Sequence, residues 1–213
     1  EILIGLVGSE MCIRDRYFQL IEECDNIDDQ RRYLDIIRER LNSLNEMLEE
    51  LFTFTKLKND SYKLELTDCC MNRILKEAVF SYYDEWKKQG ICPDISITEE
   101  MLYISGNKQG LRRVIQNVIK NGLDHGKKNI SIKLTREDNY ALLKISNYAE
   151  HPENIDLSHV FERFYKADVA RGRASTGLGL SIAKELVERM NGDISARIKG
   201  NDFIIEIKVL LVV

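Results

Sequence analysis

The chain has 213 residues, of which 44% are hydrophobic and 31% are charged, a composition typical of a folded globular protein and not of a disordered or fibrous one. Its 31 lysines and arginines are outnumbered by 35 aspartates and glutamates, so no basic excess favours a nucleic-acid partner. Five cysteines without C-x-x-C spacing favour reduced thiols. The apolar run at 2–8 is too short to cross a membrane, so we expect no membrane segment and a cytoplasmic location for this chain.

The first sixteen residues have no clear helical or strand period. Their part at 6–16 resembles a translated sequencing adapter, and we interpret 1–16 as a non-native or unstructured N-terminus. The authentic sequence then begins near Tyr17. The alternative is an ordinary helical N-terminus.

Residues 17–60 predict a helical hairpin. A helix end at 17–24 is followed by the polar break 25–28 and by one long helix over 29–58 without Gly or Pro. Apolar residues of this helix alternate three and four apart, at Leu34, Ile37, Leu41, Leu44, Leu48 and Leu51. So narrow a seam favours pairing with a second copy in a four-helix bundle. The alternative is a lone amphipathic helix packed on its own domain.

Residues 61–213 predict one α+β domain. We expect a strand at 62–66, a helix capped by Thr67 or Asp68 and ended by Gly90, and a helix at 107–123. Further strands are expected at 91–97, 101–104, 130–134 and 141–145, then a helix from the glycine-rich segment 174–179 to Met190, and a closing hairpin at 194–198 and 203–209. This order predicts a two-layer α/β sandwich with a mixed, mostly antiparallel sheet.

The segment Ser175–Leu180 reads S-T-G-L-G-L and leads into a helix. Glycines let backbone N–H groups approach a phosphate, and a helix N-terminus adds unpaired donors and partial positive charge. The spacing is neither that of a Walker loop nor that of a Rossmann turn. The pattern therefore indicates either a phosphate site or a flexible helix cap.

Two amides, Asn117 and Asn121, lie four residues apart and share one face of the predicted helix, with Asp124 and His125 one turn further on. An amide oxygen beside substrate phosphates is a suitable ligand for Mg²⁺, a hard cation. The alternative is a helix cap or a set of interhelical hydrogen bonds.

Four blocks follow one another in an order that resembles the ATP-binding domain of bacterial sensor histidine kinases, in the GHKL ATPase superfamily. They are an N box at 117–125, a G1 box at 145–152, an F box at 161–166 and a G2 box at 176–180. Residues 17–58 are similar to the latter part of the dimerisation and phosphotransfer hairpin of that family. The resemblance implies a sheet of the GHKL (Bergerat) type.

The resemblance also implies ATP and Mg²⁺ as cofactors. Asn121 would bind Mg²⁺, with Asn117 supporting it, and residues 176–179 would hold the phosphates. Residues 166–175 would form a lid, with Lys166 as a cation for the terminal phosphate or as a mere surface residue, and Phe161 and Phe164 would anchor it. The implied nucleotide-binding residues are Asn117, Asn121, Asp124, His125, Asn147, Ala149, Tyr165, Lys166, Arg173, Ser175, Thr176, Gly177, Leu178, Gly179 and Leu180.

Three features depart from the family pattern. Asn147 stands where an Asp usually accepts from the adenine amino group, and Ala149 and His151 replace two glycines. Asp124 stands where a Lys often assists the phosphates. The His-Glu-x-x-Arg-Thr-Pro block with the phospho-acceptor histidine has no counterpart, so no catalytic residue is assigned and the chain should not phosphorylate itself on that histidine.

The resemblance thus implies the ATP-binding part of a sensor histidine kinase, which passes the γ-phosphoryl group to a histidine missing from this chain and then to a response-regulator aspartate. Expected partners are a second copy, through the hairpin, and a response-regulator receiver domain. We expect the full-length protein to be membrane-anchored. The alternatives are a non-catalytic dimerisation or scaffold module with a degenerate nucleotide site, and another GHKL enzyme such as an anti-sigma serine kinase, which the hairpin disfavours.

Overall fold

The computed structural model describes residues 12, 15–21, 24, 26–59, 63–125, 129–166 and 176–212. It divides into two compact units, Glu1–Thr53 and Phe54–Val213. The expected non-native stretch at 1–16 lies almost entirely outside the described residues. None of the described helices has an apolar stretch long enough to cross a membrane.

The first unit contains two helical segments, residues 15–21 and most of α2 (Ile27–Leu57). The side chain of Asn26 caps α2 by accepting a hydrogen bond from the Asp28 N–H at 3.0 Å. The Gln30 amide donates back to the Cys24 carbonyl at 2.6 Å, and the rings of Tyr17 and Tyr33 lie 5.8 Å apart. Asn26, inside the polar break predicted at 25–28, therefore supplies the helix cap, and the helix begins at Ile27, two residues before the predicted start.

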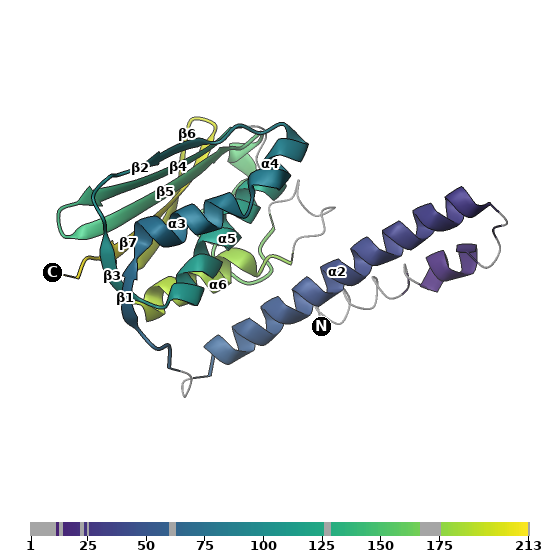
Figure 1. Ribbon diagram of the computed structural model, residues 1–213, viewed down its shortest axis with the longest axis horizontal. Helices are drawn as coiled ribbons and strands as arrows, with labels where there is room; N and C mark the ends of the chain where they lie inside the picture. The colour runs from purple at the N-terminus through teal and green to yellow at the C-terminus, as the bar shows by residue number, and fades with distance from the viewer. Residues whose placement is uncertain are drawn as a thin grey trace. The chain divides into compact units, whose positions relative to one another are not determined.

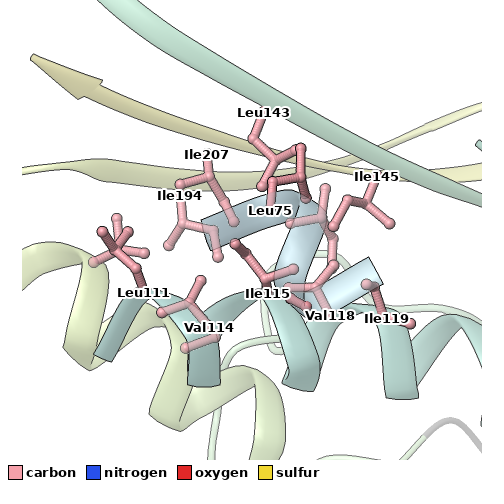
Figure 2. Close-up of a cluster of buried hydrophobic side chains, with 14 of the residues drawn as sticks. Leu75, Leu111, Val114, Ile115, Val118, Ile119, Leu143, Ile145, Ile194 and Ile207 are labelled. Carbon is pink, nitrogen blue, oxygen red and sulfur yellow. The ribbon is translucent and has the colours of Figure 1, made fainter. Parts of the chain in front are cut away.

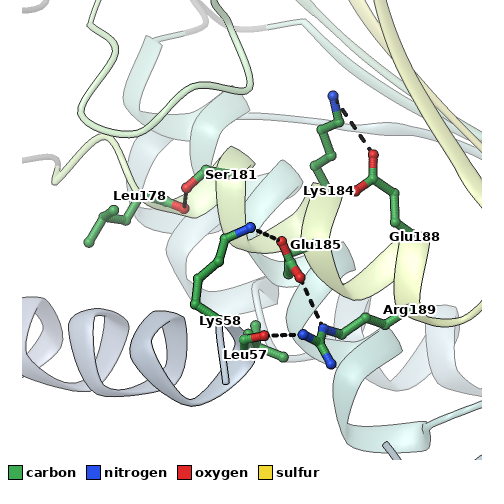
Figure 3. A network of polar contacts seen from close by, with 8 residues as sticks. All are labelled: Leu57, Lys58, Leu178, Ser181, Lys184, Glu185, Glu188 and Arg189. Carbon is green, nitrogen blue, oxygen red and sulfur yellow. Dashed lines mark hydrogen bonds and ion pairs between the residues drawn. The ribbon is translucent and has the colours of Figure 1, made fainter. Parts of the chain in front are cut away.

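The last turn of α2 belongs to the second unit, where Phe54 and Leu57 are buried in the main hydrophobic core. Figure 3 shows the polar contacts that hold this turn to α6 (Gly179–Arg189): Lys58 Nζ lies 2.6 Å from Glu185 Oε2, and Arg189 Nε lies 3.0 Å from Glu185 Oε1. Arg189 also donates to the Leu57 carbonyl. The main core thus begins inside α2.

The second unit is built on a five-stranded sheet in the order β2-β4-β5-β7-β6. Only β2 and β4 run parallel; the other pairs are antiparallel. A small antiparallel sheet pairs β1 with β3. The strands are β1 (Thr67–Cys70), β2 (Asp94–Ile97), β3 (Tyr103–Gly106), β4 (Ile130–Glu137), β5 (Tyr140–Tyr148), β6 (Asp193–Lys199) and β7 (Asp202–Leu210). The predicted mixed, mostly antiparallel sheet is confirmed.

Helices α3 (Met71–Phe80), α5 (Lys108–His125) and α6 form a layer on one side of this sheet, with the short α4 (Tyr83–Gln89) near its end (Figure 1). The apolar stripe of α5 points into the space between the layers (Figure 2). It meets side chains of β5, β6 and β7; the labelled members of this core include Leu111, Val114, Ile115, Val118, Ile119, Leu143, Ile145, Ile194 and Ile207. The periodicity of three and four in α5 is therefore the periodicity of its buried face.

The segment before Gly90 differs from its prediction. Residues 63–66 have no regular structure, and Thr67 and Asp68 do not cap a helix; they pair with Gly106 and Ser105 in the small sheet. The predicted single helix is two helices, interrupted at Ser81–Tyr82, where the Ser81 hydroxyl donates to the Ala78 carbonyl at 2.6 Å. Cross-strand pairing overrides the capping preference of Thr and Asp here. Gly90 ends α4 in the left-handed conformation, as predicted.

Candidate functional site

Asn117, the first of the two amides of α5, lies where this helix passes the beginning of α6. The helix places Asn117 and Asn121 one turn apart on the same face, and both are half-buried. Asn117 Nδ2 donates to the carbonyl of Gly179, the first residue of α6, at 2.9 Å. The structure thus brings the N box and the glycine turn together, although 62 residues separate these two hydrogen-bonded positions.

The glycine turn has a shape that only glycine supports at one position. Gly177 has φ of +70°, and a Cβ built on it would lie 2.8 Å from the Phe164 Cα and 3.0 Å from the Tyr165 carbonyl oxygen. The Phe164 N–H donates to the Gly177 carbonyl at 3.0 Å, and the Thr176 hydroxyl accepts from the Leu178 N–H at 3.1 Å. The backbone of this turn therefore packs directly on the F box.

The start of α6 carries backbone groups of the kind that can bind an anion. Its first N–H groups have no partner inside the helix, and the helix dipole adds partial positive charge. A Cβ on Gly179 would lie 3.8 Å from the side chain of Asn117, an ordinary contact. Leu178 is buried and Leu180 half-buried, and both join the core, so the turn presents backbone to its surroundings while its apolar side chains anchor it.

The G1 segment begins at the end of β5. Asn147 pairs across the sheet with Ile130 and Phe203, and only 6% of it is exposed. A Cβ on Gly122 would lie 3.6 Å from the Asn147 side chain, so this amide packs against α5 next to Asn121. Asn147 Nδ2 donates to the Tyr148 carbonyl at 3.4 Å, a weak bond.

Ala149, which stands in the place of a family glycine, is also 6% exposed. Its N–H donates to the Asn201 carbonyl at 2.7 Å, and the Asn201 side chain donates to the Ala149 carbonyl at 3.2 Å. The second substituted glycine position, His151, is exposed, and its Nδ1 lies 3.2 Å from Glu153 Oε1. The segment is thus fastened to the turn between β6 and β7.

In the sequence, the F box lies between the G1 segment and the glycine turn. Phe161, Phe164 and Tyr165 are half-buried against the core. The Tyr165 hydroxyl accepts from the Asp156 N–H at 2.6 Å. Hydrogen bonds from Ser158 and His159 hold the pKa of the Asp156 carboxyl below its ordinary value, and the same carboxylate raises the pKa of His159.

Several predicted site residues are placed less closely. Asp124 is half-buried on α5, and Lys166 is half-buried at the end of the F box. Arg173, Ser175 and the side chain of His125 lie outside the described residues. No group of three or more His, Cys, Asp or Glu among the described residues is arranged to hold a metal ion; the predicted ligand Asn121 is an amide.

Sequence reasoning missed two residues of this region, Gly122 and Asn201. Gly122 follows the predicted metal ligand directly in the N box, and a Cβ there would make an ordinary contact, 3.6 Å, with the Asn147 side chain. Asn201 was assigned only to a hairpin turn, and nothing local to that turn indicates its contact with Ala149.

A cavity of about 430 Å³ lies elsewhere in the second unit, beside the last turn of α2. Its walls come from α2, the F box and α6, and include Phe54, Phe161, Arg163 and Glu185. None of the predicted nucleotide-binding residues that the structure describes lines it. The guanidinium of Arg163 lies 4.4 Å from the centre of the Phe54 ring, so this cavity is bounded by a cation–π contact.

A comparison with protein families matches residues 106–211 to the family described as histidine kinase-, DNA gyrase B- and HSP90-like ATPases. This range extends from the last residue of β3 to just beyond β7, and it contains all the predicted nucleotide-binding residues.

Two curated proteins are similar over most of the chain. The sensor histidine kinase YcbM of Bacillus subtilis is 30% identical over 189 residues, which cover 86% of this chain and 61% of YcbM. The sensor protein VanS of Enterococcus faecium is 27% identical over 191 residues, which cover 87% of this chain and 49% of VanS. The chain therefore spans only part of the length of these relatives.

Solved structures of histidine kinases share the fold. The histidine kinase AdeS of Acinetobacter baumannii matches with a TM-score of 0.75 at 17% identity, over 96% of each chain. The histidine kinase ThkA, solved in complex with the response regulator protein TrrA, matches with a TM-score of 0.79 at 16% identity, over 99% of this chain and 60% of that one. At such low identity these matches support the fold alone.

Proposed function

The chain belongs to the family of histidine kinase-, DNA gyrase B- and HSP90-like ATPases, and we propose that it is the ATP-binding part of a sensor histidine kinase. The observation that carries this proposal is the hydrogen bond between Asn117 and the Gly179 carbonyl. Through this bond the polar face of α5 and the glycine turn border the same region, which is what a site for a metal-bound triphosphate requires.

In the proposed site, the phosphates of ATP bind the backbone N–H groups at the start of α6. The residue types present fit this use, since Gly177 cannot carry a Cβ and the helix end supplies unpaired donors. Asn121 offers an amide oxygen for Mg²⁺, which neutralises phosphate charge when bound. Asn117 links α5 to α6, because its amide donates a hydrogen bond to the carbonyl of Gly179, the first residue of α6.

Asn147 is the proposed acceptor for the adenine amino group. A neutral amide accepts more weakly than a carboxylate, by roughly 1 kcal/mol, so we expect ATP affinity about fivefold below that of an aspartate at this position. The buried Ala149 limits how closely the base can approach this segment. Base recognition is therefore weakened and not removed.

In the intact protein, ATP bound here would phosphorylate a histidine on the hairpin, and the phosphoryl group would pass to a response-regulator aspartate. Support comes from the sensor relatives and from ThkA, whose structure was solved with the response regulator TrrA. Catalysis would be positional and electrostatic. We also propose that the full-length protein is membrane-anchored, since YcbM and VanS are sensor proteins.

We assign homodimerisation to the hairpin. One row of the heptad seam in α2 is open to solvent in the single chain: Leu34, Leu41 and Leu48 are 50%, 41% and 50% exposed. Three leucines seven residues apart on one helix face are typical of a surface that a second helix covers. Dimerisation would bring a second copy of this face against the first.

Calorimetric titration of the chain with ATP in the presence of Mg²⁺ tests the nucleotide site. We expect saturable binding, and no heat at millimolar ATP would contradict the proposal. The competing scaffold function makes a different prediction: the chain would bind no ATP, and Asn147→Asp would create binding that the parent lacks. Binding by the parent excludes that alternative.

A further inference from the structure

Tyr165 contacts the segment that follows Ala149, and its backbone lies against the glycine turn. Its hydroxyl oxygen accepts the backbone N–H of Asp156 at 2.6 Å, nine residues earlier in the chain. Its ring packs against the hydrophobic core. We propose that Tyr165 is a positioning residue that couples the base-binding segment to the phosphate-binding turn. This inference rests on the proposed function and deepens it.

On the phosphate side, the contact is made by backbone. The carbonyl oxygen of Tyr165 would lie 3.0 Å from a Cβ on Gly177, and its neighbour Phe164 donates its N–H to the Gly177 carbonyl at 3.0 Å. Phe164 has a positive φ of 61°, an unusual conformation for a bulky residue that brings its backbone against the glycine turn. Tyr165 is therefore held in place by the turn that would receive the phosphates.

On the base side, the segment after β5 has two fixed points. Ala149 exchanges hydrogen bonds with Asn201, and Asp156 donates to Tyr165. Between them lies one turn of 3-10 helix, Pro152–Asn154. Because Asn147 and Ala149 adjoin this segment, the position of its far end affects how they meet a base.

The Asp156 side chain takes no part in the contact with Tyr165, because it forms its hydrogen bonds with other residues. Its carboxylate accepts from Ser158, at 3.0 Å from the backbone N–H and 2.5 Å from the hydroxyl, and lies 2.7 Å from His159 Nδ1. The backbone N–H of Asp156 donates to the Tyr165 hydroxyl instead. Removing that hydroxyl alone breaks the link and leaves the Asp156 turn intact.

Tyr165→Phe makes this change with the ring retained. Tyr140→Phe is the matched control, because Tyr140 stands at the other end of β5 from Asn147, where it contacts Lys208. The first measurement is amide hydrogen exchange by NMR on the nucleotide-free protein. We expect exchange at Asp156 to be about tenfold faster in Tyr165→Phe and unchanged in Tyr140→Phe. Unchanged exchange at Asp156 in both variants overturns the proposal.

The second measurement compares ATP with inorganic triphosphate, each with Mg²⁺. The bond between Phe164 and Gly177 survives in Tyr165→Phe, so triphosphate should bind as tightly as to the parent, while ATP should bind roughly threefold to tenfold more weakly. An equal loss for both ligands shows a direct phosphate contact and overturns the coupling. A loss for ATP without faster exchange at Asp156 shows a direct contact with the base and also overturns it.

The parent protein separates this inference from the function on which it rests. If the parent binds neither ligand, the proposed function fails, and the coupling fails with it. If the parent binds both ligands and Tyr165→Phe binds them like the parent, the function stands and the coupling alone is wrong.

Discussion

The two ends of the proposed nucleotide site are built differently. At the phosphate end, the backbone of a glycine turn and one helix start carry the recognition, and the side chain of Asn117 secures them. At the base end, side chains fill the space: Asn147 and Ala149 are both buried, and Asn201 ties down the segment. A glycine in the phosphate-binding turn cannot be replaced, because no other residue fits its backbone conformation and close contacts. A single side chain that accepts a hydrogen bond can be replaced by another acceptor at a modest loss of affinity.

Gly177→Ala should disrupt the glycine turn at the phosphate end and have the largest effect of the substitutions proposed. The substitution adds a Cβ within 3 Å of backbone atoms of Phe164 at a positive φ, so we expect about 2–4 kcal/mol of lost stability together with loss of ATP binding. Chemical denaturation followed by the fluorescence of Trp86 measures the stability, because Trp86 is the sole tryptophan and is 4% exposed.

Gly90→Ala is the matched control for backbone conformation. Gly90 has φ of +66° but nothing within 4 Å of its Cβ position, so this variant should lose only about 1 kcal/mol and bind ATP normally. Equal losses at the two glycines would contradict the close approach of Gly177 to the F box.

Asn117→Ala should loosen the phosphate end without a clash. It removes the hydrogen bond to the Gly179 carbonyl, and we expect ATP affinity to fall about tenfold. Gln116→Ala, one position earlier on α5, should leave the affinity unchanged. Calorimetric titration of both variants compares them directly, and an unaltered affinity in Asn117→Ala would show that the two helices need no such link.

Asn147→Asp should strengthen binding of the adenine base and leave binding of the phosphates unchanged. A charged acceptor should tighten ATP binding about fivefold, with no gain for inorganic triphosphate. Competition titrations with the two ligands separate these effects. A gain for both ligands would mean that the carboxylate acts on the fold and not on the base.

Glu185→Gln tests whether the far end of α6 matters to the phosphate end. Partial burial raises the pKa of Glu185, but hydrogen bonds from Lys58 and Arg189 outweigh burial and hold this pKa below its ordinary value of 4.5. A lowered folded-state pKa stabilises the protein above pH 4.5, and this contribution is lost as the pH falls through the folded-state pKa.

We expect Glu185→Gln to cost about 0.5–1 kcal/mol near pH 7, a small loss because the Lys58 side chain is 46% exposed. The difference from the parent should shrink below pH 4.5, and ATP affinity should not change. Denaturation midpoints across this pH range measure the loss. A pH-independent difference would show that packing, and not charge, is responsible.

Local patterns predicted the framework of the second unit. The apolar repeat of α5, the mixed sheet and the end of α4 at Gly90 follow from periodicity and turn chemistry, which act over a few residues. The same rules misplaced the first strand, because the pairing of Thr67–Cys70 with β3 depends on residues more than thirty positions away.

For the site, the sequence motifs indicated which residues to consider but not how they are joined. Asn117 and Gly179 were both candidates, while the hydrogen bond between them is a tertiary contact. The Asn201 side chain meets the Ala149 carbonyl 52 positions away, and the Tyr165 hydroxyl meets the Asp156 N–H nine positions away. Such contacts depend on the packed geometry of the whole domain, which no local pattern encodes.

The most direct test of the central claim is the metal dependence of ATP binding in the parent and in Asn121→Ala, measured by calorimetric titration with Mg²⁺ and again with EDTA. If Asn121 and the turn at Gly177–Gly179 hold one metal-bound triphosphate, Mg²⁺ should tighten ATP binding at least tenfold in the parent and much less in the variant. Equal affinities with and without Mg²⁺ in the parent, or an undiminished metal effect in Asn121→Ala, would contradict the account.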